Sequence, residues 1–149
     1  MRHRIAATVL ATGTAAATLF AAAPASAAPS VHIAEIYYNS PGKDTRSNSS
    51  LNAEWVRIKN STSRAVSLRN WTLTDASRHR YTFGSYTLKA GKSVKVRTGR
   101  GDDTAANRYQ DRRAYVWNND RDTATLRKAN GSKADSCSYN DSRHASVLC

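Results

Sequence analysis

The segment EWVRIKNSTSRAVSLRNWTLTD, residues 54–75, contains two runs of alternating apolar and polar residues, separated by a polar turn. In the first run, Val56 and Ile58 fall on one face and Arg57 and Lys59 on the other, as in a half-buried β-strand. The second run repeats this alternation with tryptophan and leucine opposite two threonines. The segment therefore predicts two strands of a sheet that packs on a core with one face only.

The large apolar side chains of this segment are predicted to lie in the core, because aromatic residues in such positions are more often core than ligand cage. The predicted core positions are Trp55, Val56, Ile58, Trp71 and Leu73. Glu54 and Asp75 each stand beside a strand end, and we interpret them as carboxylates that cap turns.

The rest of the chain contains further short runs of the same kind, bounded by turn residues. Strands are predicted at residues 31–38, 66–68, 81–83, 93–97, 123–127 and 134–139. The Asn-Gly dipeptide at residues 130–131 separates the last two runs and predicts a hairpin turn. Because no segment carries a long helical period, we expect an all-β sandwich.

Two segments lack a strand pattern. Residues 43–52 are polar and serine-rich and are expected to form a mobile loop. Residues 99–113 form an irregular insertion, in which a helical turn at 105–107, capped by Asp102 or Asp103, is predicted.

The first 27 residues have the features of a cleaved secretory signal peptide. A positive head precedes an uncharged stretch rich in alanine and threonine, and small residues at 25–27 precede a cleavage point before Ala28. The remaining residues, 28–149, number 122 and suit a single domain. They contain no other apolar run long enough to cross a bilayer, so we expect a secreted, extracellular protein without a transmembrane segment.

Cys137 and Cys149 are the only cysteines of the chain. Outside the cell, two such cysteines are expected to form a disulfide near the C-terminus. They match neither the ligand count of a zinc site nor a C-x-x-C redox motif.

Six segments resemble, in order and spacing, a known family. They are IAEIYYN, AEWVRIKN, VSLRNWTLTD, YTF, LKAGKSVKVRTG and WNNDRDTATLRKANGSKADSCSY, and the similarity extends over about residues 31–139. The chain is similar in these segments to the lamin tail domain, an immunoglobulin-like β-sandwich that is found in nuclear lamins and in secreted bacterial proteins. The resemblance implies this fold and a binding role, and it implies no shared catalytic residues.

The positive charge is concentrated in one part of the sequence. Residues 43–100 contain 13 Lys and Arg against 3 Asp and Glu, whereas residues 101–149 contain 8 against 7. Such a one-sided excess indicates a polyanionic partner. The predicted binding residues are Arg57, Lys59, Lys95 and Arg97 on the outward faces of two strands, with Arg78, His79 and Arg80 at a hairpin tip.

Motifs for catalysis or metal binding are weak by comparison. The histidines His32, His79 and His144 lack metal-ligand spacing, and no serine stands in a G-x-S-x-G motif. Oxygen-bearing side chains alternate as in calcium loops, but the glycine and glutamate of an EF-hand are missing. These residues are Asn118, Asp120 and Asp122. Calcium there stays an open alternative, and we expect no catalytic residue, no bound metal and no cofactor.

These observations predict a secreted, non-catalytic binding module that engages a polyanion through a basic face. DNA, an anionic cell-wall polymer and an acidic membrane surface are the candidate partners, and the sequence indicates no protein partner. Two alternatives stay open: a structural or surface-associated protein without affinity for polyanions, and a small secreted nuclease.

Overall fold

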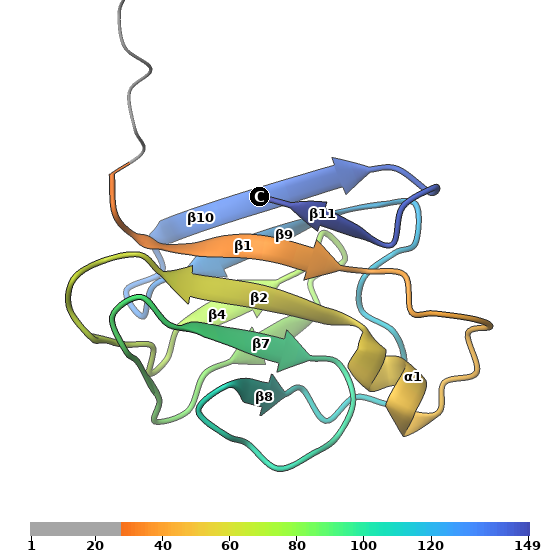
Figure 1. Ribbon diagram of the computed structural model, residues 1–149, viewed down its shortest axis with the longest axis horizontal. Helices are drawn as coiled ribbons and strands as arrows, with labels where there is room; N and C mark the ends of the chain where they lie inside the picture. The colour runs from red at the N-terminus through yellow and green to blue at the C-terminus, as the bar shows by residue number, and fades with distance from the viewer. Residues whose placement is uncertain (1–27) are drawn as a thin grey trace, which may run out of the picture.

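The computed structural model describes residues 28–149, so the predicted signal peptide lies outside the described residues. Two sheets form the two layers of a sandwich (Figure 1). The first has five strands in the order β11-β1-β2-β7-β8. Its strands are β1 (Val31–Tyr37), β2 (Trp55–Asn60), β7 (Ser93–Arg97), β8 (Asn107–Tyr109) and β11 (Ser146–Leu148).

The second sheet has four strands in the order β10-β9-β4-β5, and in Figure 1 it lies behind the first. Its strands are β4 (Thr72–Thr74), β5 (Arg80–Thr82), β9 (Arg121–Arg127) and β10 (Lys133–Asn140). A two-stranded ribbon pairs β3 (Val66–Ser67) with β6 (Thr87–Leu88). All strand pairs are antiparallel except β7 with β8. The all-β sandwich predicted from the sequence is confirmed.

The core lies between the sheets, and the alternation along β2 and β4 places its side chains there. Val56 and Ile58 are completely buried, and Trp71 and Leu73 are buried beside them, as predicted. Trp55 was wrongly predicted to be a core residue. It lies one position out of phase with Val56, and successive strand residues point to opposite faces, so its side chain is on the outer face.

The Asn-Gly hairpin is confirmed between β9 and β10, where Gly131 has a φ of 84°. Such a left-handed conformation favours glycine because it has no Cβ. The main-chain N–H of Lys128 donates to the Ser132 carbonyl across this turn.

Two predictions about the loops are wrong. Residues 43–52 do not form only a loop, because the helix α1 (Asn48–Ala53) begins after Ser47, whose hydroxyl accepts a hydrogen bond from the Ser50 N–H. Serine is a good N-cap for this reason. The segment 99–113 contains no helical turn but the strand β8, and the Asp103 carboxylate accepts the N–H of Tyr109 within it.

The predicted disulfide between Cys137 and Cys149 is present. Cys137 belongs to β10 in the four-stranded sheet, whereas Cys149 follows β11 at the edge of the five-stranded sheet. The bond therefore joins the two layers of the sandwich.

Candidate functional site

Four of the predicted binding residues come together on the outer face of the five-stranded sheet. β2 and β7 are neighbours, and Arg57 stands directly opposite Lys95 in their register. Arg97 stands opposite Trp55, and Lys59 lies two positions beyond Arg57 on the same face. We call Arg57, Lys59, Lys95 and Arg97 the sheet-face cations.

Most of the sheet-face cations are already engaged by other groups of the protein. Arg57 forms an ion pair of 2.8 Å with Glu35 on β1. The Arg97 guanidinium donates to the Asn52 carbonyl at 2.6 Å and to Asn107 Oδ1 at 2.7 Å. Of the four, only Lys59 is exposed, and the other three are half-buried.

The Lys95 side chain packs over the ring of Trp55 on this face. The Lys95 Nζ atom lies 3.8 Å from the centroid of the Trp55 ring, a favourable cation–π contact. Tyr37, on the strand at the other side of β2, stacks against the same ring at a centroid distance of 5.4 Å. Burial lowers the pKa of Lys95, and the neighbouring Arg97 and Arg57 lower it further, against the opposing effect of Glu35.

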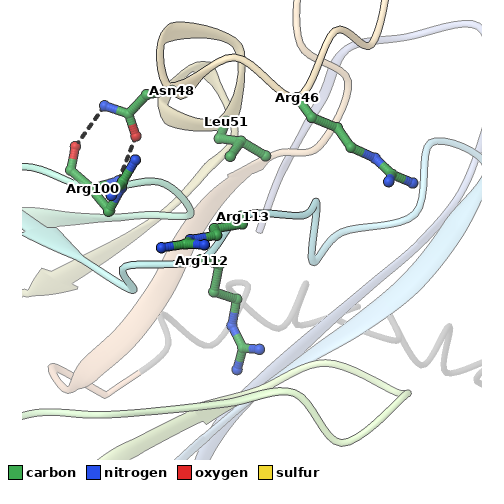
Figure 2. A pocket seen from close by; sticks show the side chains of 6 residues that line it. All are labelled: Arg46, Asn48, Leu51, Arg100, Arg112 and Arg113. Atoms are coloured by element: carbon green, nitrogen blue, oxygen red, sulfur yellow. Dashed lines mark hydrogen bonds between the residues drawn. The ribbon is translucent and has the colours of Figure 1, made fainter.

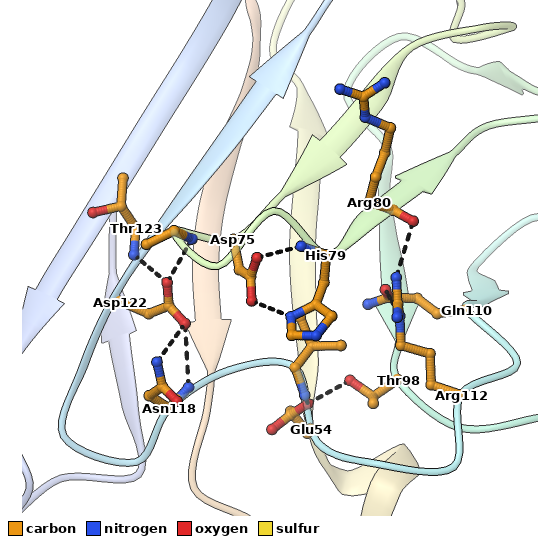
Figure 3. Close-up of polar contacts among 12 residues, drawn as sticks. Glu54, Asp75, His79, Arg80, Thr98, Gln110, Arg112, Asn118, Asp122 and Thr123 are labelled. Atoms are coloured by element: carbon orange, nitrogen blue, oxygen red, sulfur yellow. Dashed lines mark hydrogen bonds and ion pairs between the residues drawn. The ribbon is translucent and has the colours of Figure 1, made fainter.

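The remaining predicted residues, Arg78, His79 and Arg80, belong to the other sheet, at the hairpin between β4 and β5. Asp75 fixes this hairpin, because its buried carboxylate accepts the His79 N–H at 2.7 Å and contacts His79 Nδ1 at 2.6 Å (Figure 3). The interpretation of Asp75 as a turn-capping carboxylate is confirmed. The structure thus divides the predicted binding residues between two surfaces.

The interpretation of Glu54 as a carboxylate that caps a turn is wrong. Its side chain is completely buried, and Oε1 accepts the Thr98 hydroxyl at 2.6 Å and the Val116 N–H at 2.9 Å (Figure 3). Burial raises the pKa of Glu54 to about 7, although both hydrogen bonds act in the opposite direction. Glu54 therefore anchors two distant loops beside α1.

Asp122 anchors a third segment at the same end of the sandwich. Its buried carboxylate accepts main-chain N–H groups from Ala76, Asn118 and Thr123 (Figure 3). Through these three carboxylates, the loops around residues 54, 76 and 98–118 meet at one end of the sandwich. We call it the α1 end.

Two hollows at the α1 end are rich in arginine. The first has a volume of about 430 Å³ (Figure 2). It is lined by Arg46, Asn48, Leu51, Arg100, Arg112 and Arg113. The second, of about 440 Å³, shares Arg112 and Arg113 with the first and adds His79, Tyr115 and the carboxylate of Asp111.

Sequence reasoning missed the first hollow. Arg46 and Arg100 were counted as part of the basic region, and Arg112 and Arg113 as part of a nearly neutral region. The adjacent arginines at 112–113 were the only local sign of this hollow in the sequence. Arg46 and Arg100 lie on loops that are more than fifty residues apart in the sequence. Only the packing of these loops brings the four residues together.

A comparison with protein families agrees with this fold. The family model described as Lamin Tail Domain matches residues 24–141 of the chain. The chain belongs to the lamin tail domain family. No curated protein matches the chain at a significant level. Membership supports an immunoglobulin-like β-sandwich that serves as a binding or structural module.

The oxygen-bearing residues of the possible calcium loop have protein partners in this lamin tail domain. Asp122 accepts main-chain N–H groups, as described above, and Asp120 Oδ1 accepts the N–H of Arg121 at 2.8 Å. Within residues 28–149, no group of three or more His, Cys, Asp or Glu side chains is arranged to hold a metal ion. In the same residues, no helix combines the length and the apolar character that crossing a membrane requires.

Proposed function

We propose that this lamin tail domain is a secreted, non-catalytic module that binds a polyanion, either DNA or an anionic cell-surface polymer. One observation carries the proposal: three exposed arginines, Arg46, Arg100 and Arg113, line one hollow at the α1 end, and the described residues that line that hollow include no carboxylate. The features of residues 1–27 support export. Family membership supports a binding role without naming the ligand.

The charge balance supports the same proposal. Residues 28–149 carry 21 Lys and Arg against 11 Asp and Glu. Arginine and lysine release condensed counterions when they neutralise phosphates, so a polyanion gains affinity from every such contact. A partner of opposite charge would also be steered to the protein at low salt.

A salt series tests this function. Purified protein is titrated with duplex DNA, with an anionic wall polymer and with anionic vesicles, each over a range of salt concentrations. If about four phosphates are engaged on duplex DNA, the slope of log affinity against log salt should be about −3 to −4. Binding should be equal for DNA of different sequences, because phosphate contacts carry no sequence information.

Two outcomes would contradict the proposal. An absence of binding to all three partners at low salt would favour a structural role. Loss of DNA on incubation with a divalent cation would favour the nuclease alternative.

A further inference from the structure

We propose that the polyanion docks on the α1 end and not on the sheet-face cations, and that it is a linear phosphodiester chain recognised by its phosphate groups alone. This inference rests on the proposed function and assigns it a site. The contact residues are Arg46, Arg100 and Arg113, with Arg112 beside them (Figure 2). We call these four residues the arginine surface.

The arginine surface is favoured over the sheet face as the docking site because it carries guanidinium groups without partners among the described residues. Arg46, Arg100 and Arg113 are exposed, and their guanidinium groups form no hydrogen bond or ion pair with residues 28–149. On the sheet face, Arg57 is paired with Glu35, and Arg97 donates to two oxygens of the protein. A phosphate at the sheet face would have to compete with these partners for the guanidinium groups, whereas at Arg46, Arg100 and Arg113 it displaces water and counterions only.

The main chain at Arg100 is held in place. Asn48 and Asn52 both donate to the Arg100 carbonyl, at 2.9 and 2.8 Å, and Asn48 also accepts the Arg100 N–H. A Cβ at Gly99 would lie 2.6 Å from Asn52 Oδ1, so glycine allows this close approach between α1 and the loop. At Arg100, only the side chain must become ordered when a ligand binds, which limits the entropy lost on binding.

Arg112 differs from the other three arginines. Its guanidinium donates to the Arg80 carbonyl at 3.1 Å and to Gln110 Oε1 at 3.3 Å. It therefore joins the loop that follows β8 to β5 and positions its neighbour Arg113. We assign it a mainly structural part in the surface.

The shape and composition of the first hollow indicate an extended ligand. Its six lining residues include no carboxylate and no aromatic ring on which a base could stack. Figure 2 shows the Arg46 side chain directed away from Arg112 and Arg113, so the guanidinium groups do not converge on one point. Separate cations around an open hollow match successive phosphates of a chain better than a single anion.

The test compares two variants that each lose three positive charges. The first replaces Arg46, Arg100 and Arg113 by Gln. The control replaces Arg64, Lys89 and Lys92 by Gln. These three exposed residues lie around Asn60, at the end of β2 opposite to α1. Thermal unfolding of both variants establishes that they are folded before binding is measured.

The probes are an oligothymidylate and an abasic phosphodiester oligomer of the same length. The Arg46, Arg100 and Arg113 variant should bind both about a hundredfold more weakly at about 0.1 M salt, with a slope shallower by about 2, since each single-strand phosphate contact contributes about 0.7 to the slope. The control variant should lose much less affinity. The two probes should bind the wild type alike, and inorganic phosphate at matched ionic strength should not compete.

The outcomes separate this inference from the proposed function. Equal losses in the two variants, or much weaker binding of the abasic probe, would overturn the inference while leaving polyanion binding intact. Effective competition by inorganic phosphate would show that the surface binds a single anion and not a phosphodiester chain. This outcome would also overturn the inference. Tight binding to anionic vesicles without binding to either oligomer would assign the surface to a membrane and contradict it. No binding of the wild type to any polyanion would refute the proposed function itself.

Discussion

At the scale of single residues, three buried carboxylates organise the α1 end: Glu54, Asp75 and Asp122. The sequence correctly predicted the part played by Asp75, because its partner His79 is only four residues away and the contact is local. It could not predict the part played by Glu54, whose partners Thr98 and Val116 are 44 and 62 residues away. Local patterns define turns, but only tertiary packing decides which carboxylate becomes buried.

Glu54 makes the stability of the domain depend on pH. Its pKa in the folded protein is raised to about 7 from an ordinary 4.5, so the folded state binds a proton more tightly than the unfolded state. This contribution to the free energy of unfolding is fully present below about pH 4.5 and is lost as the pH rises through about 7. The loss should amount to about 3 kcal/mol over this window.

Urea unfolding of the wild type and of Glu54→Gln at about pH 5 and about pH 8 measures this effect. The amide can still accept the hydrogen bonds of Thr98 and Val116 but does not titrate, so the variant should lack most of the pH dependence. Contributions of groups other than Glu54 are common to both proteins and cancel in the difference. The same pH dependence in both proteins would show that Glu54 is not the responsible group.

At the scale of elements, the sequence predicted those strands whose alternation has a buried face. β2, β7 and the β9–β10 hairpin were found in this way, because two or more of their positions point into the core. β8 was missed because all three of its residues are half-buried and none is a branched apolar residue. The short edge strand β11 was also missed, since it depends on pairing with β1.

α1 shows why the candidate site could be predicted only in part. Its capping serine was visible in the sequence but was interpreted as part of a mobile loop, because a helix of one or two turns has no period to detect. The contacts of Asn48 and Asn52 with Arg100 span about fifty residues. The sheet-face cations followed a strand period and were predicted, whereas the arginine surface depends on loop packing and was not.

The disulfide should stabilise one element more than the rest of the domain. Replacing Cys137 and Cys149 by Ser should lower the free energy of unfolding by about 3 kcal/mol, since a short closed loop restricts the unfolded chain. Because Cys149 follows β11 directly, hydrogen exchange should rise first at Val147, which pairs with Ile36, while amides of β2 stay protected. Uniformly faster exchange over both sheets would contradict this local role.

At the scale of the whole molecule, charge counted along the sequence differs from charge counted over the surface. The basic excess of residues 43–100 is divided between the sheet face, the β4–β5 hairpin, the α1 end and the opposite end of β2, where Arg64, Lys89 and Lys92 lie. Two arginines from the nearly neutral region join Arg46 and Arg100 at the α1 end. A polyanion responds to the local field of such a cluster, and the net charge of a segment does not determine that field.

Export is the prediction that concerns the whole chain, and cleavage before Ala28 is compatible with the fold. β1 begins at Val31, so cleavage before Ala28 keeps every strand and helix described in residues 28–149. Ala28 and Asp135 line the same hollow, of about 380 Å³. A new ammonium group at Ala28 would therefore lie in the same hollow as a carboxylate, with a gain of less than about 1 kcal/mol at such an exposed site.

The intact mass of protein collected from the culture medium tests cleavage and oxidation together. It should equal that of residues 28–149 less the two hydrogens lost when Cys137 and Cys149 form their bond. Alkylation without reductant should leave this mass unchanged, and alkylation after reduction should add two groups. A mass that includes Met1 would refute cleavage. Two alkylated cysteines without reductant would refute oxidation, even if the N-terminus is as predicted.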